Sequence, residues 1–321
     1  GRCPYFFPYF FPYYFSYFEL PRNGTLENLE HWYYFDYQNV RFITLNSNPP
    51  YDNEIQQAWL DALLLETERR DDLDFVLLQL HHPAESELWL EGESAFSKSV
   101  NLKLGEFSAK SGKPSVALSG HTHGYSRGHD PENPLTMLIN GSIGGATDNW
   151  GEFKQRDYLN YVISKDEHGW CLVQVTIGPT ATMSFKRYSF GKDGNVKDQG
   201  VVDQFILRRH NSTPETPTLN LAQASIESSP YHEEQGDSHL TTQWQASTTM
   251  TMDKIFWNRI NHAYNEYGGT FTQQQQNLTN LSLPEIAGSA ELKIFFVRAR
   301  YRDSALGYSD WSTPLKIELK R

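Results

Sequence analysis

Two short apolar runs constrain the fold of this chain more than any other feature. FVLLQL (75–80) is continuously apolar apart from one Gln, and PSVALSG (114–120) carries a similar run. Runs of this kind are typical of strands buried on both faces. DNEIQQAWLDALLLETERR (52–70) has helical spacing behind an Asp/Asn cap, and LKLGEFSAKSG (102–112) predicts a second helix that ends at Gly112. Strands and helices that alternate in this way along the chain predict an α/β fold.

The segments around this core are read as strands. WYYFDY (32–37) and VRFITLNS (40–47) predict a hairpin around Gln-Asn, and short alternating segments from LTMLINGS to VVDQFILRR are typical of an antiparallel sheet. Strand and helix alternate in the first half, and the second half is mostly strand. We therefore expect an α/β (α+β) two-sheet sandwich with helices outside over residues 21–209.

The composition changes at HNSTPETPT (210–218), which has the Pro, Ser and Thr content of a linker. Residues 219–321 follow as short strands. Within VRARYR (297–302) apolar residues alternate with arginines, which predicts a half-buried strand with a basic outer face. YSDWSTP (308–314) resembles the Trp-Ser turn of fibronectin type III modules, and this resemblance implies an all-β sandwich. We expect Trp311 to stack on an arginine of this strand, either Arg298 or Arg300.

Residues 1–20 form a low-complexity aromatic arm in which PYFF occurs twice in tandem. Prolines at positions 4, 8 and 12 exclude a regular helix interior and a central strand. One interpretation is an extended arm packed on this chain or on a neighbour. The other is an adhesive or filament-forming segment, because so much exposed aromatic surface drives self-association.

Composition excludes several classes of function. A net charge of −11 and a pI near 5.5 argue against nucleic acid or an anionic membrane as the main partner. No apolar run reaches the roughly 18 residues of a membrane span. Two cysteines, Cys3 and Cys171, make no disulfide framework. Five Asn-x-Ser/Thr sequons, of which Asn211 is expected to be the most exposed, favour a secreted or cell-surface glycoprotein. A signal peptide and an initiating Met are missing, so we expect a processed or incomplete chain.

Histidines follow both buried strands. His81 and His82 come directly after the first, and His121 and His123 come after the second within SGHTHGYSRG. Side chains at i and i+2 of an extended segment point the same way, and the carboxyl ends of strands are where sites assemble in α/β folds. Neutral imidazole is a ligand for Zn, Fe and Mn. The pattern predicts a shared metal site.

LHHP and GHTHGYSR together resemble the late motifs of the calcineurin-like metallophosphoesterases, which include the purple acid phosphatases. The resemblance covers roughly residues 15–207. It implies hydrolysis of a phosphate ester substrate with two divalent or trivalent metal ions, Fe, Zn or Mn. His81 and His121 would bind the second ion, and His123 would bind the first.

The same resemblance suggests roles for three neighbouring residues. His82 would assist catalysis by supporting the ligands or contacting the substrate, and it could also replace His81 as the ligand. Arg127 would be catalytic and Tyr125 would bind the substrate, or both would support the site. Asp148 follows a Gly-rich loop that is read as a turn over the site, because it lacks phosphate-cradling spacing.

The chain departs from this family at its N-terminal end. The early motifs Asp-x-His, Gly-Asp-x-x-Asp and Gly-Asn-His-(Asp/Glu) do not occur, and no carboxylate is a candidate to bridge two ions. Two explanations stay open. The chain is a fragment of an exported phosphoesterase, or it is an inactive domain that serves in structure, adhesion or filament formation.

Overall fold

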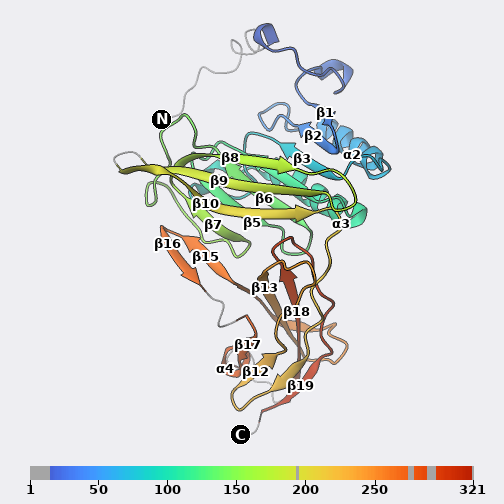
Figure 1. Ribbon diagram of the computed structural model, residues 1–321, viewed down its shortest axis with the longest axis vertical. Helices are drawn as coiled ribbons and strands as arrows, with labels where there is room; N and C mark the ends of the chain where they lie inside the picture. The colour runs from blue at the N-terminus through green and yellow to red at the C-terminus, as the bar shows by residue number, and fades with distance from the viewer. Residues whose placement is uncertain (1–14, 193–194, 274–277, 288–293, 320–321) are drawn as a thin grey trace.

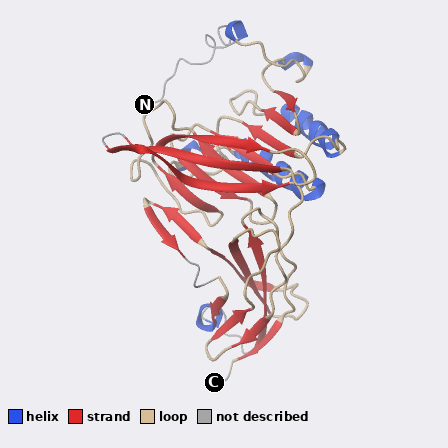
Figure 2. Ribbon diagram, viewed as in Figure 1, coloured by secondary structure: helices blue, strands red, loops and turns tan. Residues whose placement is uncertain are grey.

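The computed structural model describes residues 15–192, 195–273, 278–287 and 294–319. Within these ranges the chain has far more strand than helix, and the strands form four sheets (Figures 1 and 2). Most of the aromatic arm, residues 1–14, lies outside the described residues, so its packing stays a prediction. Phe15 is described, and its ring meets His31 edge-on with centroids 5.0 Å apart.

The largest sheet has nine strands in the order β1-β2-β3-β4-β6-β5-β7-β15-β16. Its strands are β1 Tyr33–Tyr37, β2 Val40–Thr44, β3 Phe75–Gln79, β4 Ser115–Ser119, β5 Tyr125–His129, β6 Leu135–Asn140, β7 Tyr161–Lys165, β15 Tyr264–Tyr267 and β16 Thr270–Gln273. The predicted hairpin is confirmed as the antiparallel pair β1–β2. Both apolar runs are confirmed as neighbouring parallel strands, since β3 pairs with β4 and β4 with β6.

Two helices cover one face of this sheet. In α2 (Glu54–Glu68) the Asn53 side chain caps the first turn by accepting a hydrogen bond from the Gln56 backbone N–H at 3.1 Å. In α3 (Ala95–Ser111) the chain leaves the helix at Gly112, whose φ of 64° is the left-handed conformation that glycine adopts without strain. Their apolar residues pack on side chains of β2, β3, β4 and β6. Both predicted helices are confirmed.

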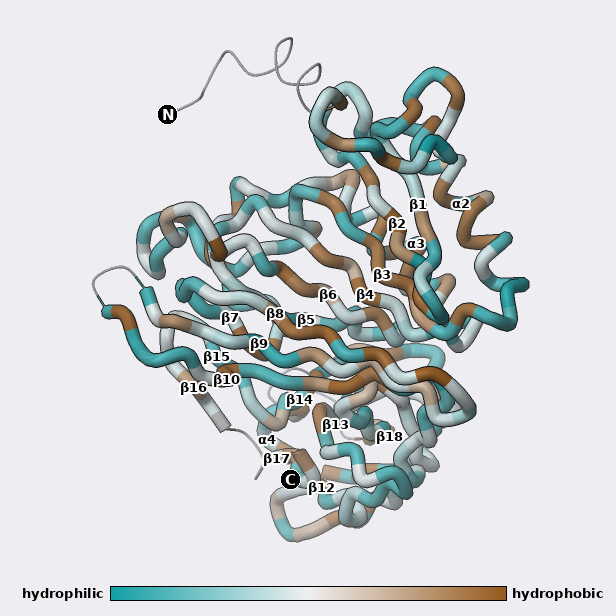
Figure 3. Tube along the Cα trace, turned by 45° about the horizontal axis from the view of Figure 1, so that its top comes forward, coloured by the Kyte–Doolittle hydropathy of each residue, from teal (hydrophilic) through white to brown (hydrophobic). Residues whose placement is uncertain are grey.

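A three-stranded sheet covers the opposite face. It consists of β8 His168–Val175, β9 Thr182–Lys192 and β10 Asn195–Arg208, in the order β10-β9-β8. Phe75, Leu77 and Val116 of the large sheet pack in one core with Met183 and Phe185 of β9. Hydrophobic stretches run along strands of both sheets (Figure 3). The expected two-sheet sandwich is therefore present, with its long helices on the outer face of the larger sheet.

The C-terminal region forms a second, all-antiparallel sandwich. Its two sheets have the orders β11-β12-β17 and β14-β13-β18-β19. The elements are β11 Leu219–Leu221, β12 Ser225–Ser228, β13 His239–Ser247, β14 Ile255–His262, β17 Asn280–Ser282, a short helix α4 Leu283–Ala287, β18 Ile294–Asp303 and β19 Leu315–Glu318. Trp244 and Ala299 are fully buried between the sheets. Seven short strands in two sheets agree with the all-β prediction.

The arginines of β18 divide into two groups. The guanidinium carbons of Arg298 and Arg300 lie 4.1 and 4.6 Å from the ring centroid of Trp311, so the predicted stacking is confirmed for both. Arg302 was expected on the same basic outer face, and this prediction is wrong. Its side chain is buried and donates hydrogen bonds of 2.6 Å to the backbone carbonyls of Asp130 and Asn133. These two acceptors belong to the turn before β6, so Arg302 joins the two sandwiches.

The hairpin β15–β16 crosses the predicted domain boundary. It arises within the C-terminal region, yet β15 pairs in parallel with β7 through Glu266 and Ile163. Lys165 of β7 forms an ion pair with Glu266. The C-terminal region thus supplies the last two strands of the larger sheet.

Three further predictions, on the exposure of Asn211, on the cysteines and on membrane spans, can be compared with the structure. Asn211 is half-buried rather than exposed, because its side-chain amide donates a hydrogen bond of 2.9 Å to the Asp303 carboxylate. Cys171 is a free, half-buried thiol, and Cys3 lies outside the described residues. Of the helices in the described ranges, none combines the length and apolar character needed to cross a membrane.

Candidate metal centre

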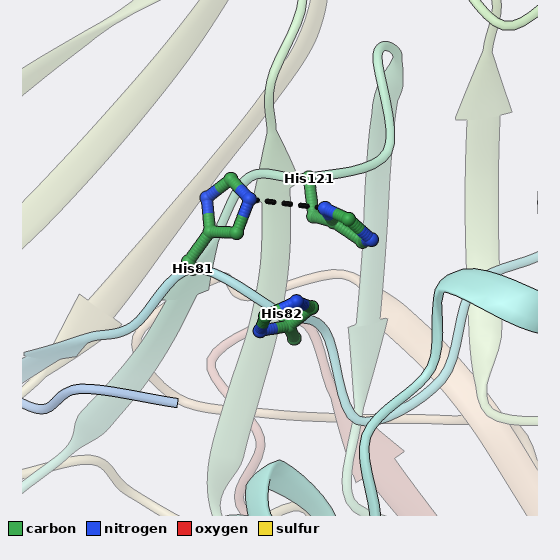
Figure 4. A group of neighbouring side chains, drawn as sticks. All are labelled: His81, His82 and His121. Atoms are coloured by element: carbon green, nitrogen blue, oxygen red, sulfur yellow. Dashed lines mark hydrogen bonds between the residues drawn. The ribbon is translucent and has the colours of Figure 1, made fainter. Parts of the chain in front are cut away.

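Three histidines gather at the carboxyl ends of β3 and β4 (Figure 4). His81 and His82 follow β3, and His121 follows β4. A backbone hydrogen bond of 3.1 Å from Gly120 N–H to the His81 carbonyl joins the two segments. Each of the three side chains offers one ring nitrogen, and these nitrogens all lie within 4.8 Å of one another. The parallel pairing of the strands brings residues forty positions apart to the same edge.

The closest pair has the separation of two ligands on one ion. His121 Nδ1 and His81 Nε2 lie 2.9 Å apart, and one ring N–H donates to the other nitrogen. Two nitrogens bound to a single metal ion at about 2.1 Å lie about 3.0–3.4 Å from each other. A change of tautomer that moves the proton to the other nitrogen of the donor ring, with small rotations of the rings, would direct both lone pairs to one ion. The donor set therefore fits a transition metal.

Ser47 orients the third ring. Its Oγ lies 2.9 Å from His82 Nδ1 and accepts a hydrogen bond of 3.0 Å from the His82 backbone N–H. Ser47 follows β2, so a third neighbouring strand contributes to the same edge of the sheet. The sequence signal was available, since Ser47 ends the predicted strand VRFITLNS.

Burial lowers the pKa of all three histidines. For His121 the pKa falls to about 4, mainly through burial and further through the neighbouring His82 and His81. Burial also lowers the pKa of His81 and of His82, and His82 adds to the effect at His81. The imidazoles are therefore neutral at pH 7, which is the form that binds metal ions.

Trp89 fixes the orientation of His121. The two rings stack with centroids 4.8 Å apart and an interplanar angle of 29°, and the Phe153 ring contacts Trp89 in a tilted arrangement with centroids 5.2 Å apart. A Cβ at Gly92 would come within 2.8 Å of the Trp89 ring, so a larger residue at this position would clash with Trp89. Nothing in the sequence pattern singled out Trp89.

His123 lies outside this group of three. Its ring Nδ1–H donates to the Ala146 carbonyl at 2.7 Å, and its backbone N–H donates to Asp148 Oδ2 at 2.7 Å. Asp148 N–H returns a bond of 3.0 Å to the His123 carbonyl. Asp148 thus closes the Gly-rich loop onto His123, as expected for a turn beside the site. The role of His123 as a metal ligand stays a prediction.

Tyr125 and Arg127 lie in the interior between the two sheets. They are only 1% and 5% exposed. Tyr125 Oη donates to Asp203 at 2.6 Å, and Arg127 donates through Nε and Nη2 to the two oxygens of the same carboxylate at 2.6 and 2.9 Å. A further bond of 2.6 Å joins Arg127 to Tyr264 Oη. Their predicted contacts with a substrate stay predictions, while the structure gives both a structural partner.

Asp203 was not singled out from the sequence, although a signal existed. It is the only acidic residue in the apolar run VVDQFIL of β10. The positive charge of Arg127 holds the pKa of Asp203 below its usual value against the opposing effect of burial. Together Tyr125, Arg127 and Asp203 form a buried polar network that joins β5 to β10.

No protein-family model and no curated protein sequence matches the chain. Among solved structures it is similar to purple acid phosphatase PPD1 from yellow lupin (Lupinus luteus) seeds, with 15% identity, a TM-score of 0.42, and coverage of 60% of this chain and 34% of that one. PhoD is similar with 12% identity, a TM-score of 0.40, and coverage of 61% and 46%. GAP50, the anchor in the inner membrane complex of Plasmodium, shows 14% identity, a TM-score of 0.35, and coverage of 54% of both chains.

The chain spans about half the length, or less, of each of these three structures. A shared fold does not by itself imply a shared function. At these identities and TM-scores the comparisons leave family and activity open, so a function has to be argued from the residues of the site.

Proposed function

We propose that this chain is the metal-binding part of an exported phosphoesterase-like hydrolase, with His81, His82 and His121 holding one divalent transition-metal ion. The observation that carries the proposal is the convergence of three ring nitrogens within 4.8 Å at the ends of two parallel strands. The resemblance of LHHP and GHTHGYSR to metallophosphoesterase motifs supports the reaction class.

A bound divalent ion supplies Lewis-acid polarisation of a phosphoryl oxygen. The residues of this chain prepare the place for it. His81 and His121 offer two nitrogens 2.9 Å apart, Ser47 contacts the His82 ring, and Trp89 stacks on the His121 ring and restricts its rotation. In this proposal His123, which is hydrogen-bonded to Asp148, is a further metal ligand. A second ion would need carboxylate ligands that the histidine group does not supply.

A second candidate function is structural or adhesive, in a surface protein without catalysis. One observation favours it, because within the described part of the chain the histidine group includes no carboxylate. The C-terminal sandwich, which we propose to be fibronectin type III-like, would then be the main module, held to the first by Arg302. Secretion and glycosylation are common to both proposals.

Metal titration tests the first proposal directly. We expect Zn²⁺, Co²⁺ or Mn²⁺ to bind with a stoichiometry of one ion per chain in isothermal titration calorimetry. We also expect bound Co²⁺ to show the absorption bands that are typical of cobalt with nitrogen ligands. His81→Ala and His121→Ala should each abolish binding, while His210→Ala, which changes an exposed histidine, should not. Equal binding by all three variants would overturn the metal site.

A further inference from the structure

A groove with a volume of about 470 Å³ opens directly beside the histidine group. His81 lies in its wall, and so does Ser47, whose Oγ contacts the His82 ring at 2.9 Å. Two lining residues therefore touch the candidate metal site. The volume lies within the range of small-molecule sites, about 300–1,000 Å³. A molecule bound through the metal site would place its remaining atoms in this groove.

Aromatic rings form part of the groove's lining. They belong to Phe15, His31 and Tyr33. The His31 ring stacks on Tyr51 with centroids 4.2 Å apart and planes at 22°, which holds it in a fixed orientation. Phe15 meets the same ring edge-on at 5.0 Å. Rings held in this way favour a flat aromatic group, since offset and edge-to-face contacts are the preferred geometries.

Polar, uncharged side chains also line the groove, together with the carboxylate of Glu30. The uncharged ones belong to Asn46, Ser47 and Asn48, and the Asn48 backbone and side-chain N–H groups both donate to Asn46 Oδ1 at 3.1 Å. Neither lysine nor arginine is among the lining residues. The carboxylate of Glu30 is paired with Arg22. A negatively charged ligand group would find no cationic side chain among these lining residues, and the Glu30 carboxylate would repel it, so the groove favours an uncharged group.

We infer that the groove selects phosphate esters whose alcohol portion is an uncharged aromatic ring. The ring lies against Phe15 and His31, and the phosphoryl group lies at the ion beside His81. This inference rests on the proposed function and adds to it a class of substrate.

Ligand binding to the metal-loaded protein tests the inference without relying on turnover. Phenyl phosphate and methyl phosphate share the phosphate group and differ in the ring. Isothermal titration calorimetry should show phenyl phosphate binding about tenfold more tightly, as expected for one aromatic contact. Phe15→Ala should remove this advantage and leave methyl phosphate binding unchanged. Tyr17→Ala is the matched control, because Tyr17 is 80% exposed and does not line the groove.

The outcomes separate the two proposals. If both esters bind with equal affinity, or if the advantage survives in Phe15→Ala, the groove does not select the ring and the inference is overturned while the phosphoesterase proposal stands. If the protein binds metal but neither ester, the phosphoesterase proposal is overturned and the substrate class with it. A tenfold preference that Phe15→Ala abolishes and Tyr17→Ala retains supports both.

Discussion

The two halves of one short segment, GHTHGYSR (120–127), lie in different environments. His121 occupies a partly exposed turn after β4, where its ring faces His81 and His82. Tyr125 and Arg127 lie on β5, and both are buried in the core between the two sheets, where they donate hydrogen bonds to Asp203. Residues that are close together in one motif can therefore lie in very different surroundings, one group at an accessible turn and the other in the core.

The largest expected effect concerns the buried half. Asp203→Asn leaves the Arg127 guanidinium buried without a negative partner, which typically costs about 3–5 kcal/mol. We expect the free energy of unfolding, measured in urea, to fall by this amount. His121→Ala is the comparison in the accessible half and should change stability by less than about 1 kcal/mol. A similar loss in both variants would show that the two halves are not energetically distinct.

The segment after β3 shows the same division and gives a pH-dependent prediction. Glu87, six residues beyond His81, is fully buried and accepts hydrogen bonds of 2.7 Å from Tyr158 N–H and from Ser164 Oγ. Burial raises its pKa to about 7 from the usual 4.5. Between these two values the native state retains a proton that the unfolded state releases, so this group lowers stability as pH rises through that window.

The expected loss from Glu87 is at most about 3 kcal/mol from pH 4.5 to pH 7. Lowered histidine pKa values act in the opposite direction, because stability from a neutral buried imidazole is lost as pH falls below about 6.5. The difference between the wild type and Glu87→Gln isolates the carboxyl group. Urea unfolding at several pH values should show Glu87→Gln gaining relative stability as pH rises. An unchanged difference from pH 4.5 to 7 would contradict the raised pKa.

A smaller effect is expected on metal affinity when Trp89, which stacks on His121, is replaced. Trp89→Leu removes the ring that stacks on His121, and groups that orient metal ligands typically account for 10–100-fold in affinity. We expect metal binding to weaken by about tenfold in titration calorimetry, with the fold intact by circular dichroism. Phe153→Ala is the control, since the Phe153 ring contacts the Trp89 ring but does not itself stack on His121. Equal weakening in the two variants would argue against a positioning role.

The smallest expected effect is on turnover by the chain alone. Imidazoles without a bridging carboxylate hold at most one ion, so we expect metal-supplemented hydrolysis of p-nitrophenyl phosphate or its diester to stay near background. His123→Ala should then change nothing. Clear turnover that His123→Ala abolishes would show that the accessible half is a complete active site.

Much of the first sandwich could be predicted because its signals are local. The cap at Asn53, the left-handed Gly112 and the apolar runs of β3 and β4 each depend on residues within one element. The meeting of His81 with His121 followed from a general rule about parallel strands. Trp89 escaped prediction because it reaches His121 from a loop, and loops carry no periodicity.

The sequence by itself determined which segments become strands and helices, and which histidines follow buried strands, because periodicity, capping and turn chemistry act over a few residues. Only the tertiary structure decided the partners. Asp203 is 76 positions from Arg127, and the carbonyl of Asp130 is 172 positions from Arg302. Whether such an arginine faces water or the core depends on which sheet or turn packs against it. The environment of such a side chain is set by which faces of the sheets are buried against each other, and the residues next to it in the sequence do not specify this packing.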